Sequence, residues 1–140
     1  MRVLGLDVGE RRIGVALSDP EGIIAIALTV IERKSEETDL KQLIDLTHEH
    51  GVERIVIGLP RSLDGSLGKQ AKVVEAFVKS LAGCTELPVV TWDERLSTVA
   101  AERFLSDAGV KREKRKARRD ALAAAIMLQG YLDRGRTSST

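Results

Sequence analysis

Hydrophobic and polar residues alternate with two different periods along this 140-residue chain, and the changes of period divide it into predicted elements. Between Arg12 and Ser18 the large apolar residues fall at every second position, which is typical of a strand with one buried face. Leu40, Leu43 and Ile44 recur instead at helical spacing. The pattern predicts strands over residues 2–8, 12–18, 23–31, 54–58 and 88–92. It also predicts a helix around Leu40 to Thr47, with Glu36 near its start and Gly51 at its end, and helices over residues 71–81, 98–107 and 117–132.

The predicted order is βββαβαβαα. Three strands with short connections favour an antiparallel meander, and the alternation that follows favours parallel pairing, so we expect an α/β protein with a mixed five-stranded sheet flanked by helices. A first hairpin that turns at Glu10 and Arg11 would place Asp7 opposite Gly14. The chain shows no internal repeat or linker, which predicts a single domain over residues 1–134 and a flexible tail over residues 135–140.

Composition narrows the class of protein. Hydrophobic residues make up 43% and charged residues 31%, a balance typical of a folded domain. The longest apolar run, over residues 22–31, is too short to cross a bilayer, and the first residues lack the layout of a signal peptide. Cys84 is the single cysteine, which excludes an internal disulfide. We therefore expect a cytoplasmic protein with no membrane partner and no structural zinc.

Charge is distributed unevenly, although the formal net charge is only +1. Residues 111–119 carry a net +6, and the rest of the chain carries −5. A basic segment on an acidic body predicts contact with nucleic acid, and the alternative is a solvated charged loop. The basic residues of this segment are Lys111, Arg112, Lys114, Arg115, Lys116, Arg118 and Arg119.

Acidic residues interrupt three segments that are otherwise apolar or small. Asp7 lies in the first strand, Asp93 and Glu94 follow the last strand, and Asp120 opens an alanine-rich helix. Carboxylates near a core are costly unless they are paired or bind a metal, so the three positions together predict a divalent-metal site for phosphate chemistry. Glu94 is the preferred ligand of its pair, with Asp93 as a substitute, because neighbouring residues of an extended chain point to opposite faces.

Each acidic position also has a structural explanation, and the residues alone leave these alternatives open. Asp7 could hydrogen-bond a turn at the end of its strand. Asp93 and Glu94 could be surface charges. Asp120 could interact favourably with the dipole of its own helix.

Further basic residues lie beside these positions. Arg11 and Arg12 follow Asp7, Arg61 lies in a glycine-rich loop over residues 58–68, and Arg95 follows Glu94. Guanidinium groups bind phosphate with paired hydrogen bonds, so these arginines are candidate nucleic-acid contacts. Aromatic residues make up only 3% of the chain, which argues against recognition by base stacking and favours contact with the backbone.

Four motifs, taken in order, resemble the YqgF/RuvX family. They are Gly5-Leu6-Asp7-Val8-Gly9 with Arg12-Ile13-Gly14-Val15-Ala16, Gly58-Leu59-Pro60 with Asp64-Gly65 and Gly68, Asp93-Glu94-Arg95, and Asp120-Ala121-Leu122-Ala123-Ala124. Members of this family are described as nucleases of the 16S ribosomal RNA precursor or as proteins similar to Holliday-junction resolvases. The four motifs span residues 3 to about 132, and their order is more specific than any one of them.

The resemblance implies an RNase H-like fold and a bacterial nuclease that matures the 5′ end of 16S rRNA. Asp7, Glu94 and Asp120 match the acidic positions of the family site and would hold one or two Mg²⁺ or Mn²⁺ ions. Structured RNA is the implied partner, as pre-16S rRNA either alone or on the pre-ribosome. The segment Leu67-Gly68-Lys69 and the basic Arg119 depart from the expected pattern, which puts only the details of the substrate-binding loop in doubt.

Three other functions are compatible with the residues. A DNA four-way-junction resolvase would use the same chemistry but would need two sites and hence a dimer, whereas the chain shows no strong dimerisation stripe and favours a monomer. A non-catalytic nucleic-acid-binding factor would bind without divalent metal. A phosphotransferase of the actin-like kinase type would share the Asp7 motif, but such enzymes enclose the nucleotide between two domains.

Overall fold

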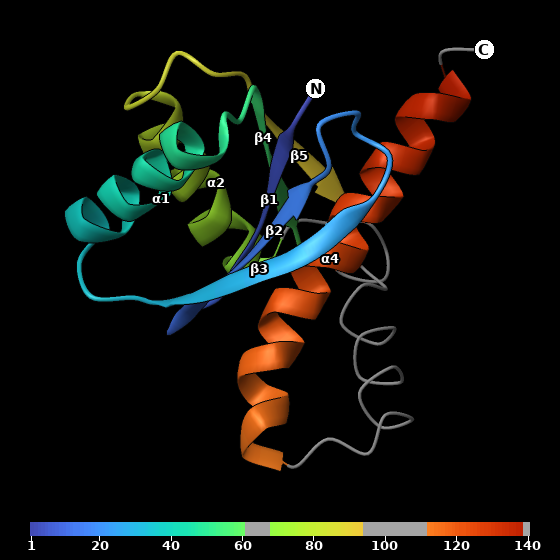
Figure 1. Cartoon of the computed structure of the whole chain (residues 1–140). Helices are drawn as coiled ribbons and strands as arrows, with labels where there is room; N and C mark the ends of the chain where they lie inside the picture. The colour runs from blue at the N-terminus through green and yellow to red at the C-terminus, as the bar shows by residue number, and fades with distance from the viewer. Residues whose placement is uncertain (61–67, 94–111, 139–140) are drawn as a thin grey trace.

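Five strands form one mixed sheet in the order β3-β2-β1-β4-β5 (Figure 1). The computed structural model describes residues 1–60, 68–93 and 112–138, and within residues 112–120 and 135–138 it describes the backbone alone. The strands are β1 (Val3–Val8), β2 (Arg12–Ser18), β3 (Ala25–Glu32), β4 (Arg54–Leu59) and β5 (Val89–Asp93). The mixed five-stranded sheet predicted from the sequence is confirmed.

The described helices are α1 (Glu36–His50), α2 (Lys69–Ala82) and α4 (Arg112–Ser138). The Ser35 side chain accepts a hydrogen bond from the Thr38 amide at the start of α1, and Gly51 ends this helix in the left-handed conformation that glycine adopts without strain. Of the described helices, none has the length and apolar character needed to cross a membrane. The helix expected over residues 98–107 lies outside the described residues.

The strand register brings Asp7 opposite Gly14 on the antiparallel β1–β2 pair, as the predicted hairpin requires. Strand β1 also pairs in parallel with β4, and β4 with β5, so the sheet is antiparallel on one side and parallel on the other. The carboxyl ends of β1, β4 and β5 therefore lie at the same edge.

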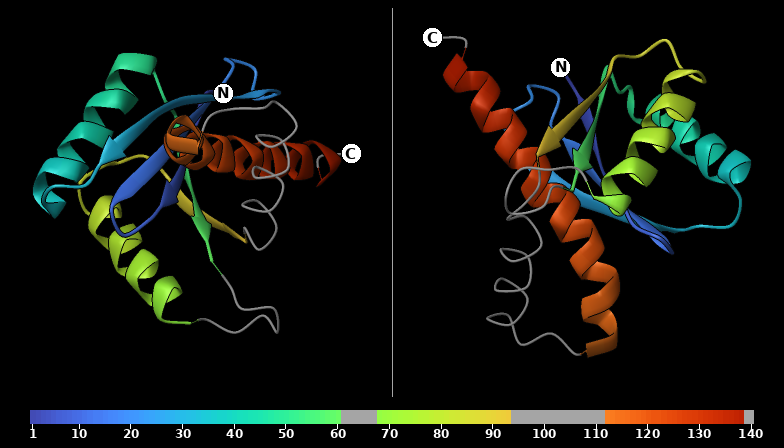
Figure 2. Two further views of the ribbon diagram at one scale, coloured as in Figure 1. Left: turned by 90° about the horizontal axis from the view of Figure 1, so that it is seen from below. Right: turned by 180° about the vertical axis from the view of Figure 1, so that it is seen from behind.

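Helices cover the two faces of the sheet separately (Figure 2). Leu4, Leu6 and Ile57 belong to a core that also contains Leu43 of α1 and Val74 of α2. On the opposite face, α4 buries its own core against the sheet, formed by Val3, Ala16, Val56, Ala124, Ala125, Met127, Leu128 and Leu132. Both faces of the sheet are thus covered by helices, and Ala124 and Ala125 of α4 are buried against it.

Helix α4 is longer than the sequence pattern predicted. It begins at Arg112 and not near residue 117, and its helical backbone continues to Ser138, through most of the expected flexible tail. Arginine, lysine, glutamate and alanine all have high helix propensity, so the basic segment continues the apolar helix without a break. Because only apolar periodicity marked the expected bounds, the charged turns at both ends were missed.

Strand β3 also departs from the expected alternation. We expected Ile24, Ile26, Leu28 and Val30 on one face. The pairing with β2 shifts register between Val15 and Ala16, so Leu28 is an extra residue on β3, and Val30 then lies opposite Gly14. Such a bulge changes which face the following residues occupy, and no propensity pattern in β3 marks it.

Candidate active site at the carboxyl edge of the parallel strands

Asp7 lies one residue before the end of β1 and is half-buried. Its neighbours along the strand show which face it occupies. Val3 packs in the core under α4, and a Cβ added to Gly5 would lie 2.9 Å from the Cβ of Leu128 in α4. By the alternation of a strand, Asp7 points to this same face. The carboxylate therefore lies at the edge where the parallel strands end, on the side covered by α4.

Glycines leave space around Asp7 on this face. Gly14 lies directly opposite on β2. On the other side of β1, Leu6 pairs with Ile57 of β4, so the next β4 residue, Gly58, lies beside Asp7. Gly58 lies on the same face of the sheet as Val56, which is the face covered by α4. Because neither glycine carries a side chain, the chain beside Asp7 can approach a ligand closely.

Asp93 ends β5 at the same edge but on the other face. Val90 and Trp92 pack into the core under α4, whereas Val89 packs into the core under α1 and α2. Asp93 has the parity of Val89, and its side chain is exposed. Asp7 and Asp93 therefore share an edge of the sheet and occupy opposite faces. Glu94 lies outside the described residues.

Helix α4 runs across the sheet so that its earlier residues approach the carboxyl edge. The hydroxyl of Tyr131 accepts a hydrogen bond of 2.8 Å from Arg54, at the start of β4. Leu128 of α4 lies against Gly5 of β1. Gly5 is two residues further along β1 than Val3, and Val3 is the residue that pairs with Arg54. Asp120 precedes Leu128 by eight residues, or about 12 Å along the helix axis. Its backbone therefore lies on the Asp7 side of this contact.

Aromatic packing fixes β5 against α4. The rings of Trp92 and Tyr131 lie 5.8 Å apart between centroids, and a Cβ added to Gly130 would make an ordinary contact of 3.5 Å with Trp92 Nε1. The strand that leads to residue 94 and the helix that carries Asp120 are thus held together by a contact next to Asp93. Trp92 serves here as a packing residue between β5 and α4.

The turn between β1 and β2 carries two of the predicted phosphate contacts. Gly9 closes this turn by donating its amide to the carbonyl of Arg12, at 2.8 Å. Arg11 is exposed, and Arg12 lies opposite Glu32 of β3. A surface hollow of about 500 Å³ is lined by Glu10, Arg11, Arg12, Glu32 and Arg33.

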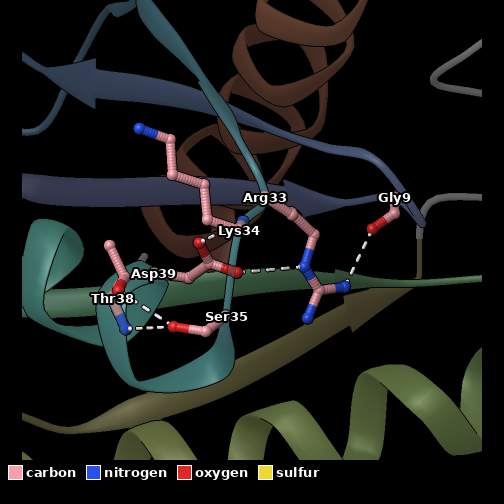
Figure 3. Close-up of polar contacts among 6 residues, drawn as sticks. All are labelled: Gly9, Arg33, Lys34, Ser35, Thr38 and Asp39. Atoms are coloured by element: carbon pink, nitrogen blue, oxygen red, sulfur yellow. Dashed lines mark hydrogen bonds and ion pairs between the residues drawn. The ribbon is translucent and has the colours of Figure 1, made fainter.

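Arg33 was not singled out from the sequence. Its guanidinium lies between Gly9 and Asp39, with Nη1 3.0 Å from the Gly9 carbonyl oxygen and Nε 3.4 Å from Asp39 Oδ2 (Figure 3). The only sequence signal for it was a basic residue between a strand end and the Ser35 helix cap, which is also common in ordinary surface connections.

Helix α2 begins near the same edge. The side-chain amide of Gln70 donates to the Val8 carbonyl at 3.4 Å, which joins the first turn of α2 to the end of β1. Gly68, the residue that caps this helix, supplies no side-chain hydrogen bond. Arg61, in the loop between β4 and α2, lies outside the described residues.

The remaining predicted residues are described incompletely. Arg95 and Lys111 lie outside the described residues, and α4 places the backbone of the other six basic residues of the segment in its first turns. Within the described part of the chain, no three histidine, cysteine, aspartate or glutamate side chains form a metal-binding group. The predicted set of Asp7, Glu94 and Asp120 includes two members whose side chains are not described, so it stays a prediction.

Comparison with known proteins identifies relatives along nearly the whole chain. A protein from Desulforamulus reducens is 51% identical over 135 residues, which cover 96% of this chain and 98% of that protein. A protein from Symbiobacterium thermophilum is 53% identical over 133 residues, which cover 95% and 92%. Both carry the name "Putative pre-16S rRNA nuclease".

Solved structures share the fold at low sequence identity. Thermus thermophilus RuvC, in complex with a Holliday junction substrate, matches with a TM-score of 0.61 and 18% identity over 96% of each chain. The fowlpox virus resolvase, in complex with Holliday junction DNA, matches with a TM-score of 0.58 and 8% identity over 95% of this chain and 97% of that one. The predicted RNase H-like fold is confirmed by these resolvases.

A family model places the chain more specifically than the fold does. The model described as "RuvX: Holliday junction resolvase" matches residues 1–134, which contain every strand of the sheet and all the acidic positions considered above. With this match and relatives at about half identity, the chain belongs to the RuvX family.

Proposed function

We propose that this chain, a nuclease that hydrolyses phosphodiester bonds, processes the 5′ end of pre-16S rRNA with a divalent metal held by Asp7, Glu94 and Asp120. The observation that carries the proposal is the position of Asp7. It is a half-buried carboxylate at the carboxyl edge of the parallel strands, opposite a glycine and on the face covered by the helix that bears Asp120. The names of the relatives supply the RNA substrate.

Strand parity favours Glu94 over Asp93 as the ligand from β5. Asp93 has the parity of Val89, whose face is covered by α1 and α2, whereas Asp7 lies on the face of α4. A strand that continued for one more residue would return to the face of Trp92 and Asp7. The proposal therefore assigns the metal to Glu94 and assigns no direct role to Asp93.

The donor chemistry fits a hard cation. Carboxylate oxygens suit Mg²⁺ and Mn²⁺, and the glycines beside Asp7 leave room for a cation and a phosphate to approach. When bound, the metal would activate a water and stabilise the charge on the leaving oxygen. Asp7 would hold the cation, and the arginines of the β1–β2 turn would bind the phosphate backbone.

The basic first turns of α4 would supply a further contact to the RNA backbone. These basic residues lie within residues 112–119, next to Asp120, so the RNA strand that they hold would lie beside the metal site. Contacts of this kind carry no base specificity, which agrees with the low aromatic content. We place the reaction in the bacterial cytoplasm, where ribosomal precursors are processed.

The test is cleavage of a 5′-extended 16S precursor RNA beside a DNA four-way junction, each with Mn²⁺, Mg²⁺ or EDTA. Wild type, Asp7→Asn and Asp45→Asn are purified identically, because Asp45 is an exposed aspartate on α1, away from the site. We expect metal-dependent cutting of the RNA by wild type and by Asp45→Asn, and loss of cutting in Asp7→Asn.

Each other outcome contradicts a separate part of the proposal. Cutting of the junction alone would replace the RNA by DNA and would agree with the description of the family model. Cutting that survives Asp7→Asn would contradict the assignment of the site. Binding without cutting in any metal would favour a non-catalytic factor on the same fold.

A further inference from the structure

Arg33 joins three elements that meet below the β1–β2 turn. It follows β3, its guanidinium donates to the carbonyl of Gly9, and the guanidinium carbon lies 5.4 Å from the centroid of the Phe77 ring in α2. Nε of the same group lies 3.4 Å from Asp39 in α1. The side chain therefore has a defined direction beside this turn.

Asp39 fixes the orientation of this guanidinium. The carboxylate is 1% exposed, and its other oxygen accepts the Lys34 amide at 3.1 Å (Figure 3). A buried carboxylate requires partners, so Asp39 holds Arg33 in place and leaves Nη1 directed at Gly9. The Arg33 side chain is itself only 21% exposed.

The backbone of Arg33 makes a second contact with the same turn. Its amide donates to the carbonyl of Arg11 at 2.8 Å. One residue therefore binds the carbonyls of Gly9 and Arg11, which flank the tip of the turn at Glu10. We call this set of hydrogen bonds, from Arg33 to Gly9, Arg11 and Asp39, the Arg33 bridge.

The cations of the turn are not equivalent. Arg12 lies directly opposite Glu32 on the neighbouring strand, a position in which opposite charges attract. Arg33 is engaged by Asp39. Arg11 is exposed at the hollow that these residues line, and its backbone is the part that the Arg33 bridge holds. Arg11 is therefore the arginine best placed to meet a phosphate.

We propose that Arg33 is a positioning residue for substrate binding, which fixes the β1–β2 turn so that Arg11 meets a phosphate of the RNA backbone. The inference rests on the proposed function for its ligand and adds a residue that acts through another. A lysine at position 33 keeps the positive charge, but its single ammonium cannot reproduce the planar, forked geometry that serves Gly9 and Asp39 together.

The test is a double-mutant cycle on affinity. Arg33→Lys, Arg11→Ala and the double variant are titrated against a fluorescein-labelled 5′-extended 16S precursor RNA in EDTA, so that no cleavage occurs. Each single change should raise Kd roughly tenfold, the loss of about one phosphate contact. If Arg33 acts through Arg11, the double variant should bind no more weakly than Arg11→Ala alone.

Arg54→Lys is the matched control. Arg54 is also a part-buried arginine with one directed hydrogen bond, to Tyr131, but it lies at the start of β4, at the opposite edge of the sheet. Its replacement should leave Kd unchanged. A second readout is exchange of the backbone amides of residues 9 and 33, which should accelerate in Arg33→Lys and stay as in wild type in Arg54→Lys.

Additive effects in the cycle, or an unchanged Kd in Arg33→Lys, would overturn the proposal. If Arg33→Lys does not fold, a variant that carries both Arg33→Gln and Asp39→Asn takes its place in the cycle, because it removes the two opposite charges together. A wild type that binds the RNA in EDTA but cuts nothing in any metal contradicts the proposed nuclease function alone. A wild type that does not bind the RNA contradicts both.

Discussion

Asp7 and Gly14 face each other across the β1–β2 ladder, one residue from the end of β1. The pair places a carboxylate beside backbone that has no side chain of its own. Gly58 continues this open surface on β4, towards the end of β5. The face of Asp7 is also the face of Trp92, so a metal ligand supplied after β5 would have to lie on that face if Asp7 holds the metal.

The first prediction distinguishes the roles of Asp93 and Glu94, the two acidic residues that follow Trp92. Glu94→Gln should lower metal-dependent cleavage by more than about 100-fold, as expected for loss of a metal ligand, since loss of an outer-shell partner already costs 10- to 100-fold. Asp93→Asn should retain activity within a few-fold, because its side chain belongs to the other face. Initial rates at saturating Mn²⁺ measure both. A larger loss in Asp93→Asn than in Glu94→Gln would reverse the assignment.

The second prediction concerns the contact between β1 and α4. A Cβ at residue 5 would lie 2.9 Å from Leu128 Cβ, and no side-chain rotation relieves a clash between two Cβ atoms. Gly5→Ala should therefore shift α4 and lower the free energy of unfolding by about 1–3 kcal/mol. Because Asp120 lies on this helix, activity should fall by more than the unfolded fraction explains.

Gly83→Ala is the comparison for that experiment. Gly83 ends α2 in a right-handed conformation, and a Cβ there meets nothing closer than 3.5 Å. Alanine should leave stability unchanged or raise it by up to about 1 kcal/mol. Urea unfolding of both variants gives the free energies. Equal effects at residues 5 and 83 would show that the contact with Leu128 is not decisive.

The third prediction concerns the basic turns of α4. Replacing Lys114, Arg115 and Lys116 by alanine should weaken RNA binding and reduce the slope of log K against log salt by about 2 to 3, since each phosphate contact contributes about 0.7 to 0.9. Removing Lys41, Lys72 and Lys79, exposed lysines of α1 and α2, takes away the same charge from the other face. That variant should keep the wild-type slope, measured by anisotropy between low and moderate salt.

The fourth prediction concerns pH and the loop between β2 and β3. The amides of Ile24 and Ile23 donate to Asp19 Oδ1 at 2.8 and 2.7 Å, and these bonds lower the pKa of Asp19 below its ordinary value of 3.8. A lowered pKa means that the ionised form stabilises the fold above 3.8, and that this contribution is lost as the pH falls through the folded-state pKa.

The measurement is a carboxyl NMR titration of Asp19, together with acid unfolding of wild type and Asp19→Asn. The titration midpoint should lie below 3.8, and the stability difference between the two proteins should vanish at the lowest pH. A midpoint at or above 3.8 would contradict the effect of the two amides. Cleavage at neutral pH should be unchanged, because the loop lies away from the Asp7 edge.

Much of this architecture could be predicted from apolar spacing, and so could the pairing of Asp7 with Gly14. A first hairpin that turns at Glu10 and Arg11 places Asp7 opposite Gly14, and the structure confirms this register. The bulge at Leu28 could not be predicted, because it depends on how β3 fits over β2 and not on the preferences of its own residues. The charged ends of α4 were missed because solvated turns carry no apolar periodicity.

The acidic residues of the candidate site could be predicted from the sequence, whereas the residue that holds the neighbouring turn in position could not. Asp7 stood out because a carboxylate among buried residues requires a reason. Arg33 did not, because its importance depends on Asp39 and Gly9, which lie 6 and 24 residues away along the chain. Contacts of that kind become visible only when the sheet and α1 are in place. The metal-binding set of Asp7, Glu94 and Asp120 stays a prediction.

The packing of α4 has a consequence for the order in which the protein is made. This helix covers β1, β2 and β3, so the core that includes Val3 and Ala16 is closed by Ala124 and Leu128. During synthesis the first three strands therefore leave the ribosome with one apolar face uncovered, and they keep it until more than ninety further residues have emerged. Asp7 faces the helix that bears Asp120 only after that docking. If the proposed metal site is right, a partly made chain would lack Asp120 at the site and would not cut RNA before this helix docks.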